Sequence, residues 1–156
     1  MKVVNKTNLD TNRLRNLFTE TKGNVKSSGL LVIVYNCNRL AHGMAWNVRS
    51  FRMNHKQNYI KCNDAIELWI NTARQYPITT TLRSRDGYKS FMCIDPYNLI
   101  TLIFLHEIGH VKDYQKGKSS KYRQTHCDEY AIKQAEKYGI AWETSRLVPV
   151  IIKEKE

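Results

Sequence analysis

The chain has 156 residues, of which 42% are hydrophobic, and a formal net charge of +11 at pH 7. This length is typical of one domain that buries its own core, so we expect a single domain over residues 1–156. No apolar run reaches the roughly 18 residues of a membrane span, and residues 1–8 lack the apolar segment of a signal peptide. These features predict a monomeric cytoplasmic protein with no membrane partner.

The first part of the chain predicts one helix followed by strands. Leucine and phenylalanine at helical spacing predict a helix over residues 9–22. The β-branched, apolar run at 29–35 predicts a central strand. A second strand is expected over 41–46 and a third within 51–62. Together with the helices predicted below, this order indicates the α+β class.

The middle of the chain predicts a helix and a hairpin. Asp64 followed by Glu67 has the form of a capping box, and the apolar residues beyond it predict a helix that ends before Pro77. Asp86 and Gly87 lie between two β-prone runs, which is a strong signal for a β-hairpin. Substrate specificity is expected to depend on the edge strand of this hairpin, because a peptide can be bound by strand addition.

A long helix is predicted between Asp95 and Gly117. Asp95 is a suitable N-cap, Pro96 suits the first turn, and Gly117 suits the position after the last turn. The intervening segment is largely apolar and has about the length of a buried helix of five or six turns. Gly109 is expected to let this helix pack closely against the sheet.

The sequence His106-Glu107-Ile108-Gly109-His110 lies in the second half of this helix. Residues four positions apart lie on the same face of a helix, so both histidines can bind a single metal ion. H-E-x-x-H is the signature of zinc metallopeptidases. We therefore predict one catalytic Zn²⁺ bound by His106 and His110, with Glu107 as the general base.

A catalytic zinc site needs a third protein ligand, and it leaves the fourth position for water. Thr125 is expected to cap a second helix that runs to Gly139, with Asp128 completing a variant capping box. The first turn of that helix would present His126, Asp128 and Glu129 toward the motif helix. The third ligand is expected to be one of these three.

The residues around the motif resemble the active-site helix of the zincin metallopeptidases. The resemblance implies a small twisted sheet packed on that helix, with protein or peptide as substrate. Within this group the chain is similar to the SprT-like proteases of DNA–protein crosslink repair. Their third histidine matches His126, the aromatic four residues later matches Tyr130, and the Gly-x-Ala segment of an upstream strand matches residues 43–45. This likeness implies association with DNA.

A second group, the gluzincin-like peptidases that include small phage and ImmA-type proteins, also resembles the chain. These proteins have an acidic ligand followed by alanines, and Asp128, Ala131 and Ala135 have that spacing. If the chain is aligned with this pattern in a shifted register, Gln124 occupies the position of the acidic ligand and Asp128 hydrogen-bonds to a metal ligand. Because imidazole suits zinc well, we favour His126, with Asp128 as the alternative, and the SprT-like group over the gluzincin-like one.

Basic residues concentrate in two stretches with aromatic residues between them, a composition that favours phosphate contacts and base stacking. The predicted nucleic-acid contacts are Arg49, Arg52, Lys116, Lys118 and Lys121. The competing interpretation is a solvated basic surface. A different class of function also stays open, namely a nucleic-acid-binding module in which zinc is structural. The candidate donors to the oxyanion of a peptidase are Tyr114, Tyr122, Arg123 and Tyr130.

Overall fold

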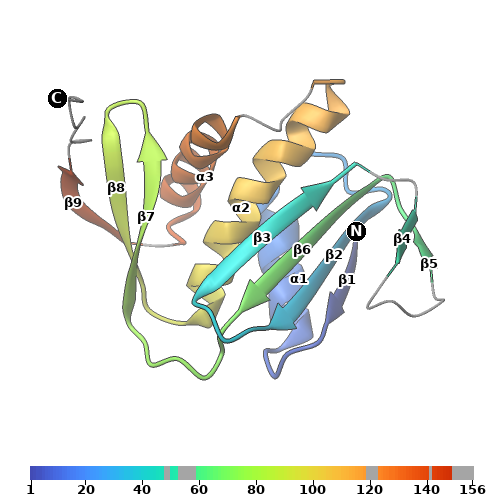
Figure 1. Cartoon of the computed structure of the whole chain (residues 1–156), viewed down its shortest axis with the longest axis horizontal. Coiled ribbons are helices and arrows are strands. Elements are labelled where there is room, and N and C mark those ends of the chain that lie inside the picture. The colour runs from blue at the N-terminus through green and yellow to red at the C-terminus, as the bar shows by residue number, and fades with distance from the viewer. Residues whose placement is uncertain (48–49, 53–58, 119–122, 141, 149–156) are drawn as a thin grey trace, which may run out of the picture.

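The computed structural model describes residues 1–47, 50–52, 59–118, 123–140 and 142–148, with only the backbone at 50–52, 59 and 142–148. The described chain is α+β, as expected from the sequence, with a small mixed sheet and three helices (Figure 1). The strands of this sheet, in spatial order, are β1 (Lys2–Asn5), β2 (Leu30–Asn36), β6 (Asp64–Ile70) and β3 (Ala41–Trp46). The first three are parallel, and β3 runs antiparallel at the edge.

Two helices, α1 (Thr11–Thr21) and α2 (Pro96–Gln115), lie behind one face of this sheet, and α3 (Gln124–Tyr138) lies beside α2 (Figure 1). The main core is formed by apolar side chains of β2, β6 and all three helices. At its centre the rings of Phe18 and Phe104 stack with centroids 4.3 Å apart. The long apolar helix is therefore buried, and no helix of the described residues is both long and apolar enough to cross a bilayer.

The hairpin predicted around Gly87 is confirmed, and it belongs to a second sheet. This sheet contains β7 (Ile78–Ser84), β8 (Gly87–Cys93) and β9 (Trp142–Val148), with β8 in the middle. The third strand expected within 51–62 is a pair of short antiparallel strands, β4 (Ser50–Arg52) and β5 (Tyr59–Lys61). The first and last strands, β1 and β9, were not predicted from the sequence.

The helix predicted after Asp64 is wrong, because this segment is the strand β6. It pairs with β2 along its whole length on one side and with β3 on the other. An interior strand is buried on both faces, so it contains consecutive apolar residues and loses the simple alternation of a half-buried strand. The Asp64 side chain does not cap a helix; it accepts a hydrogen bond from Gln115 Nε2 at 3.2 Å.

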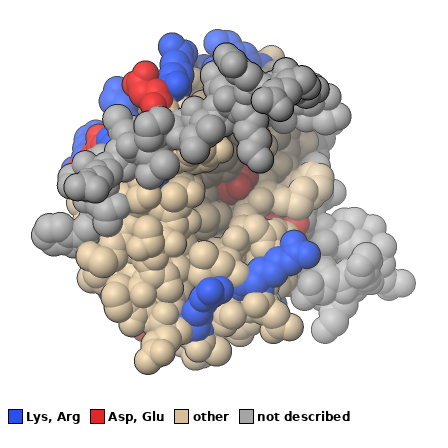
Figure 2. All heavy atoms as spheres, turned by 60° about the vertical axis from the view of Figure 1, so that its left-hand side comes forward, with Lys and Arg blue, Asp and Glu red and all other residues tan. Residues whose placement is uncertain are grey.

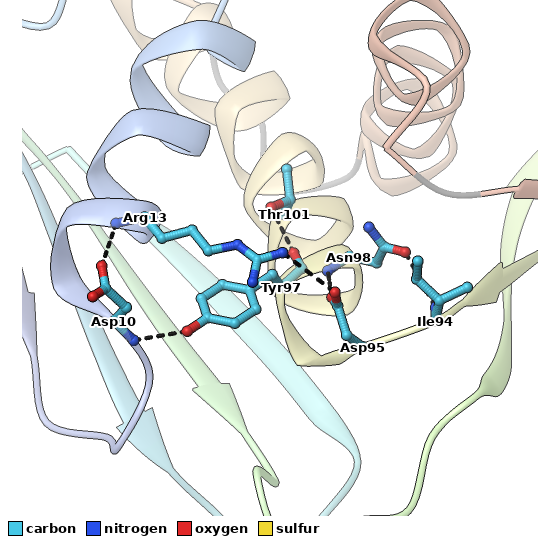
Figure 3. A network of polar contacts seen from close by, with 7 residues as sticks. All are labelled: Asp10, Arg13, Ile94, Asp95, Tyr97, Asn98 and Thr101. Atoms are coloured by element: carbon cyan, nitrogen blue, oxygen red, sulfur yellow. Dashed lines mark hydrogen bonds and ion pairs between the residues drawn. The ribbon is translucent and has the colours of Figure 1, made fainter.

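The start of α2 agrees with the sequence prediction and is joined to the start of α1 (Figure 3). Asp95 caps α2 by accepting from the Asn98 backbone N–H at 2.8 Å, and Asp10 caps α1 in the same way. The Arg13 guanidinium lies 3.8 Å from the centre of the Tyr97 ring and 3.4 Å from Asp95. These contacts fix the N-terminal end of α2 and hence the direction of the helix that carries the motif.

The expectation that Gly109 faces the sheet is wrong, because Gly109 faces α3. A Cβ built on Gly109 would lie 3.1 Å from the backbone of Cys127. Any larger residue would therefore separate α2 from α3. The close approach of these two helices brings the first turn of α3 next to the motif.

Candidate metal and catalytic site

A cleft of about 310 Å³ lies between α2, the edge strand β3 and the start of α3. Figure 2 shows a hollow in the surface with an acidic residue at its floor. The residues that line the cleft are Gly43, Met44 and Ala45 of β3, His106, Glu107, His110 and Tyr114 of α2, and Gln124 of α3. Both motif histidines and the motif glutamate thus face one space, as helical spacing predicted.

The two motif imidazoles point toward one another and toward Gln124. The Nε2 atoms of His106 and His110 are 3.2 Å apart, and Gln124 Oε1 lies 2.7 Å from the first and 3.3 Å from the second. Zinc ligands with bonds of about 2.0–2.2 Å in tetrahedral geometry lie about 3.3–3.6 Å from each other. The two imidazole nitrogens fit zinc in donor type and nearly in separation. The Gln124 oxygen fits less well, because a neutral amide is a weaker donor than a carboxylate and its 2.7 Å distance from His106 Nε2 is shorter than that between two zinc ligands.

Asp128 contacts the other nitrogen of His106. Its Oδ1 is 2.5 Å from His106 Nδ1, and its Oδ2 accepts from the Arg83 backbone N–H of β7 at 2.9 Å. A carboxylate in this position fixes the orientation and tautomer of a metal-binding imidazole. Burial lowers the pKa of His106, but the hydrogen bond to Asp128 and the nearby Glu107 outweigh it, so that the pKa is raised.

The other two residues proposed as third ligands have different contacts. His126 is 47% exposed, and its Nε2 lies 4.0 Å from Asp113 Oδ1. Glu129 accepts from the Arg85 backbone N–H at 2.9 Å and so holds α3 against β7. Among the described residues, no three His, Cys, Asp or Glu side chains lie close enough together to hold a metal ion. The structure thus leaves the choice of His126 a prediction and brings Gln124 to the motif histidines.

The cap predicted at Thr125 is wrong. The helix begins at Gln124 with Arg123 as its N-cap residue, and no side chain caps it. Asp128, expected to complete a capping box, is engaged by His106 and Arg83 instead. The register of the first turn is set by its neighbours rather than by a local capping motif.

Glu107 is buried, with 5% of its surface exposed. Burial raises the pKa of Glu107 to about 7, because the charged form loses its hydration; the charge of His106 lowers it and that of Asp128 raises it. Gly43 of β3 leaves room for this side chain, since a Cβ on Gly43 would lie 2.8 Å from Glu107 Cγ. The need for glycine at this position could not be derived from residue spacing.

The candidate oxyanion donors differ in whether they lie at the cleft. Tyr114 lines the cleft, and its hydroxyl donates to the Ala45 carbonyl at 3.4 Å. Arg123 is paired with the buried Asp113 at 3.0 Å. Tyr130 lines a different cavity, and Tyr122 lies outside the described residues. Tyr114 is thus the candidate whose hydroxyl is at the site.

The predicted nucleic-acid contacts can be placed only in part. Lys116 and Lys118 are exposed at the C-terminal end of α2. Arg49 and Lys121 lie outside the described residues, and Arg52 is described only in its backbone. Whether the five form one face therefore stays a prediction.

Comparison of the chain with protein-family models, curated proteins and solved structures found no match.

Proposed function

We propose that the chain is a zinc-dependent endopeptidase of the zincin type, with His106, His110 and Gln124 as the protein ligands of one Zn²⁺. The observation that carries the proposal is the arrangement of the cleft. Two imidazole nitrogens 3.2 Å apart lie next to a buried carboxylate, Glu107, at the edge of a sheet. This combination supplies a metal site, a base and a surface for an extended peptide.

His106, His110 and Gln124 would hold the Zn²⁺, which would supply a Lewis acid to a water molecule and to the peptide carbonyl. Glu107 takes a proton from that water molecule and returns it to the amine that leaves. Burial raises the pKa of Glu107 above the ordinary glutamate value, which favours its acceptance of a proton. Tyr114 lies on the cleft wall and can donate its hydroxyl hydrogen to the oxyanion.

The edge strand β3 is the proposed binding site for the substrate backbone. In the described sheet, β3 pairs only with β6, and its residues 43–45 line the cleft. An extended peptide can pair with the other side of β3 and lie across the motif. The edge of the β7–β8 hairpin, which the sequence predicts to hold the substrate, is less suitable. Asp128 already accepts a hydrogen bond from a backbone N–H within β7, and Glu129 accepts one from the backbone N–H next to it.

The contacts of α3 support the gluzincin-like alternative over the SprT-like one. In the SprT-like register His126 is the ligand, but its side chain points toward Asp113 and is half exposed. In the shifted gluzincin-like register, Gln124 takes the ligand place and Asp128 supports His106, which matches the contacts of both residues. The substitution of an acidic ligand by Gln implies weaker zinc binding than that of a site with a carboxylate.

The test is hydrolysis of an unfolded protein by the purified chain, followed by mass spectrometry of the fragments. We expect cleavage that a chelator abolishes and added Zn²⁺ restores. Glu107→Gln should retain zinc and the circular dichroism spectrum but lose about 10²–10⁴-fold in rate, because only the base is removed. Full activity of Glu107→Gln would exclude the mechanism. Tightly bound zinc without any hydrolysis would favour the structural-zinc alternative.

DNA remains a proposed partner, supported by the net charge of +11 and the two exposed lysines at the end of α2. Binding through phosphates should weaken steeply as salt increases, because counterions are released when the complex forms. Filter binding at several salt concentrations tests this. A lack of retention of both single- and double-stranded DNA at low salt would leave the charge without a nucleic-acid role.

A further inference from the structure

A second cavity, of about 300 Å³, lies where the segment after α1 meets the ends of α2 and α3. Four of its lining residues are lysines: Lys26, Lys112, Lys116 and Lys137. No carboxylate lines the cavity in the described part of the chain, and no ion pair between described residues involves any of the four. Four lysines from three elements therefore line one hollow, with no carboxylate among its described lining residues.

Two of the four lysines contact aromatic rings. Lys112 Nζ lies 4.8 Å from the centre of the Tyr130 ring, and Lys137 Nζ lies 5.2 Å from the centre of the Tyr138 ring. Such contacts are weaker than ion pairs, so they do not neutralise the charge of the lysines. An anion in the cavity would do so, and Tyr130 would form one wall beside it.

The wall of the cavity is held in place by other side chains. Gln115 Nε2 donates to the Lys26 carbonyl at 3.1 Å, and Gln115 Oε1 accepts from the Lys26 N–H at 3.0 Å. Gln134 Oε1 is buried and has no hydrogen-bond partner among the described residues. This oxygen is closed to solvent, so a hydroxyl or N–H of a ligand reaches it only when the Gln134 side chain turns into the cavity that it lines.

The cavity is separate from the metal site. Lys112 follows His110 by two positions, which points the two side chains about 200° apart around α2. No residue lines both cavities. A ligand here would therefore contact α2 and α3 from the side away from the motif.

We propose that this lysine cavity binds a small phosphorylated molecule that contains hydroxyl groups, such as a nucleotide or a sugar phosphate. The phosphates contact the lysines, and a hydroxyl donates to Gln134 Oε1 after this side chain turns into the cavity. The proposal concerns a ligand site of its own and does not depend on peptidase activity.

Calorimetric titration of the whole chain with two probes, adenosine triphosphate and inorganic triphosphate without divalent metal, tests the proposal. We expect saturable binding of both, tighter for the nucleotide. The double variant Lys112→Gln, Lys137→Gln should weaken binding by about tenfold or more, since two charge-assisted contacts are lost. Gln134→Leu should remove the preference for the nucleotide.

Two controls make the result specific. Lys61→Gln, Lys133→Gln removes the same charge from exposed positions outside the cavity and should bind as wild type does. Wild-type protein treated with a chelator and dialysed should also bind normally, which excludes chelation of a zinc ion by the probe. No saturable binding, or an equal loss in the Lys61, Lys133 control, would overturn the proposal. So would binding of short single-stranded DNA through these lysines when neither probe binds, because the lysines would then be part of a nucleic-acid surface.

Discussion

The motif turn of α2 and the first turn of α3 face each other across one cleft, but different forces fix their residues. On α2, His106 and His110 are brought together by helical periodicity alone, so their positions follow from the sequence. On α3, Asp128 and Gln124 are positioned by contacts with α2 and β7 that are distant in the sequence. A site residue can thus be read from local spacing only where a single element positions it.

The largest effect is expected from the loss of a motif histidine on α2. The wild-type chain should bind about one zinc per molecule, and His110→Ala should lower zinc affinity by more than about a hundredfold. This exceeds the roughly 10–100-fold cost of removing a residue behind a ligand, because a direct ligand is lost. Metal analysis after dialysis measures it. Stoichiometric zinc in His110→Ala would remove both histidines from the site.

Gln124→Glu tests the proposed zinc ligand on α3 by giving it a stronger donor atom. A carboxylate at this position should strengthen zinc binding by about tenfold or more, because an anionic oxygen replaces a neutral one. Gln124→Ala should weaken zinc binding. His126→Ala, the matched control two residues further along the same turn, should have little effect. Competition with a chromogenic chelator measures all three. A strong loss in His126→Ala with no change in the Gln124 variants would restore His126 as the ligand.

Asp128→Asn tests whether the hydrogen bond of Asp128 to His106 matters separately from its hydrogen bond to β7. The variant should lose about 10–100-fold in zinc affinity, because the imidazole is no longer oriented by a carboxylate. Glu129→Gln is the matched control, since Glu129 also holds α3 against the β7 region but is not one of the described hydrogen-bond partners of His106. Equal zinc affinities of the two variants would mean that Asp128 acts only in packing.

Gly43→Ala has the smallest expected effect and tests the strand side of the cleft. The new Cβ would lie 2.8 Å from Glu107 Cγ, so we expect a loss of about 1–3 kcal/mol in the free energy of unfolding and a lower rate of hydrolysis. In the Glu107→Ala background the same substitution should cost much less, because the opposing side chain is gone. Denaturant titration of the four proteins measures the coupling. An equal cost in both backgrounds would show that Gly43 does not make room for Glu107.

The sequence predicted much of the fold because several signals are local. Asp95, Pro96 and Gly117 delimit α2 closely, and the turn before Gly87 gives the hairpin. The prediction failed at β6, where Asp64 and Glu67 mimic a capping box. Pairing with two neighbouring strands and burial on both faces outweigh that weak local preference.

The sequence by itself determined that His106 and His110 share one face of a helix, since a helix fixes residues four positions apart whatever surrounds it. Only the tertiary structure decided what stands opposite them. The close contact of Gly109 with Cys127 brings α3 to the motif, and the hydrogen bonds of Asp128 set its rotation, so that Gln124 meets the histidines. Such rotation depends on contacts between elements far apart in the chain, and no local pattern of residues contains it.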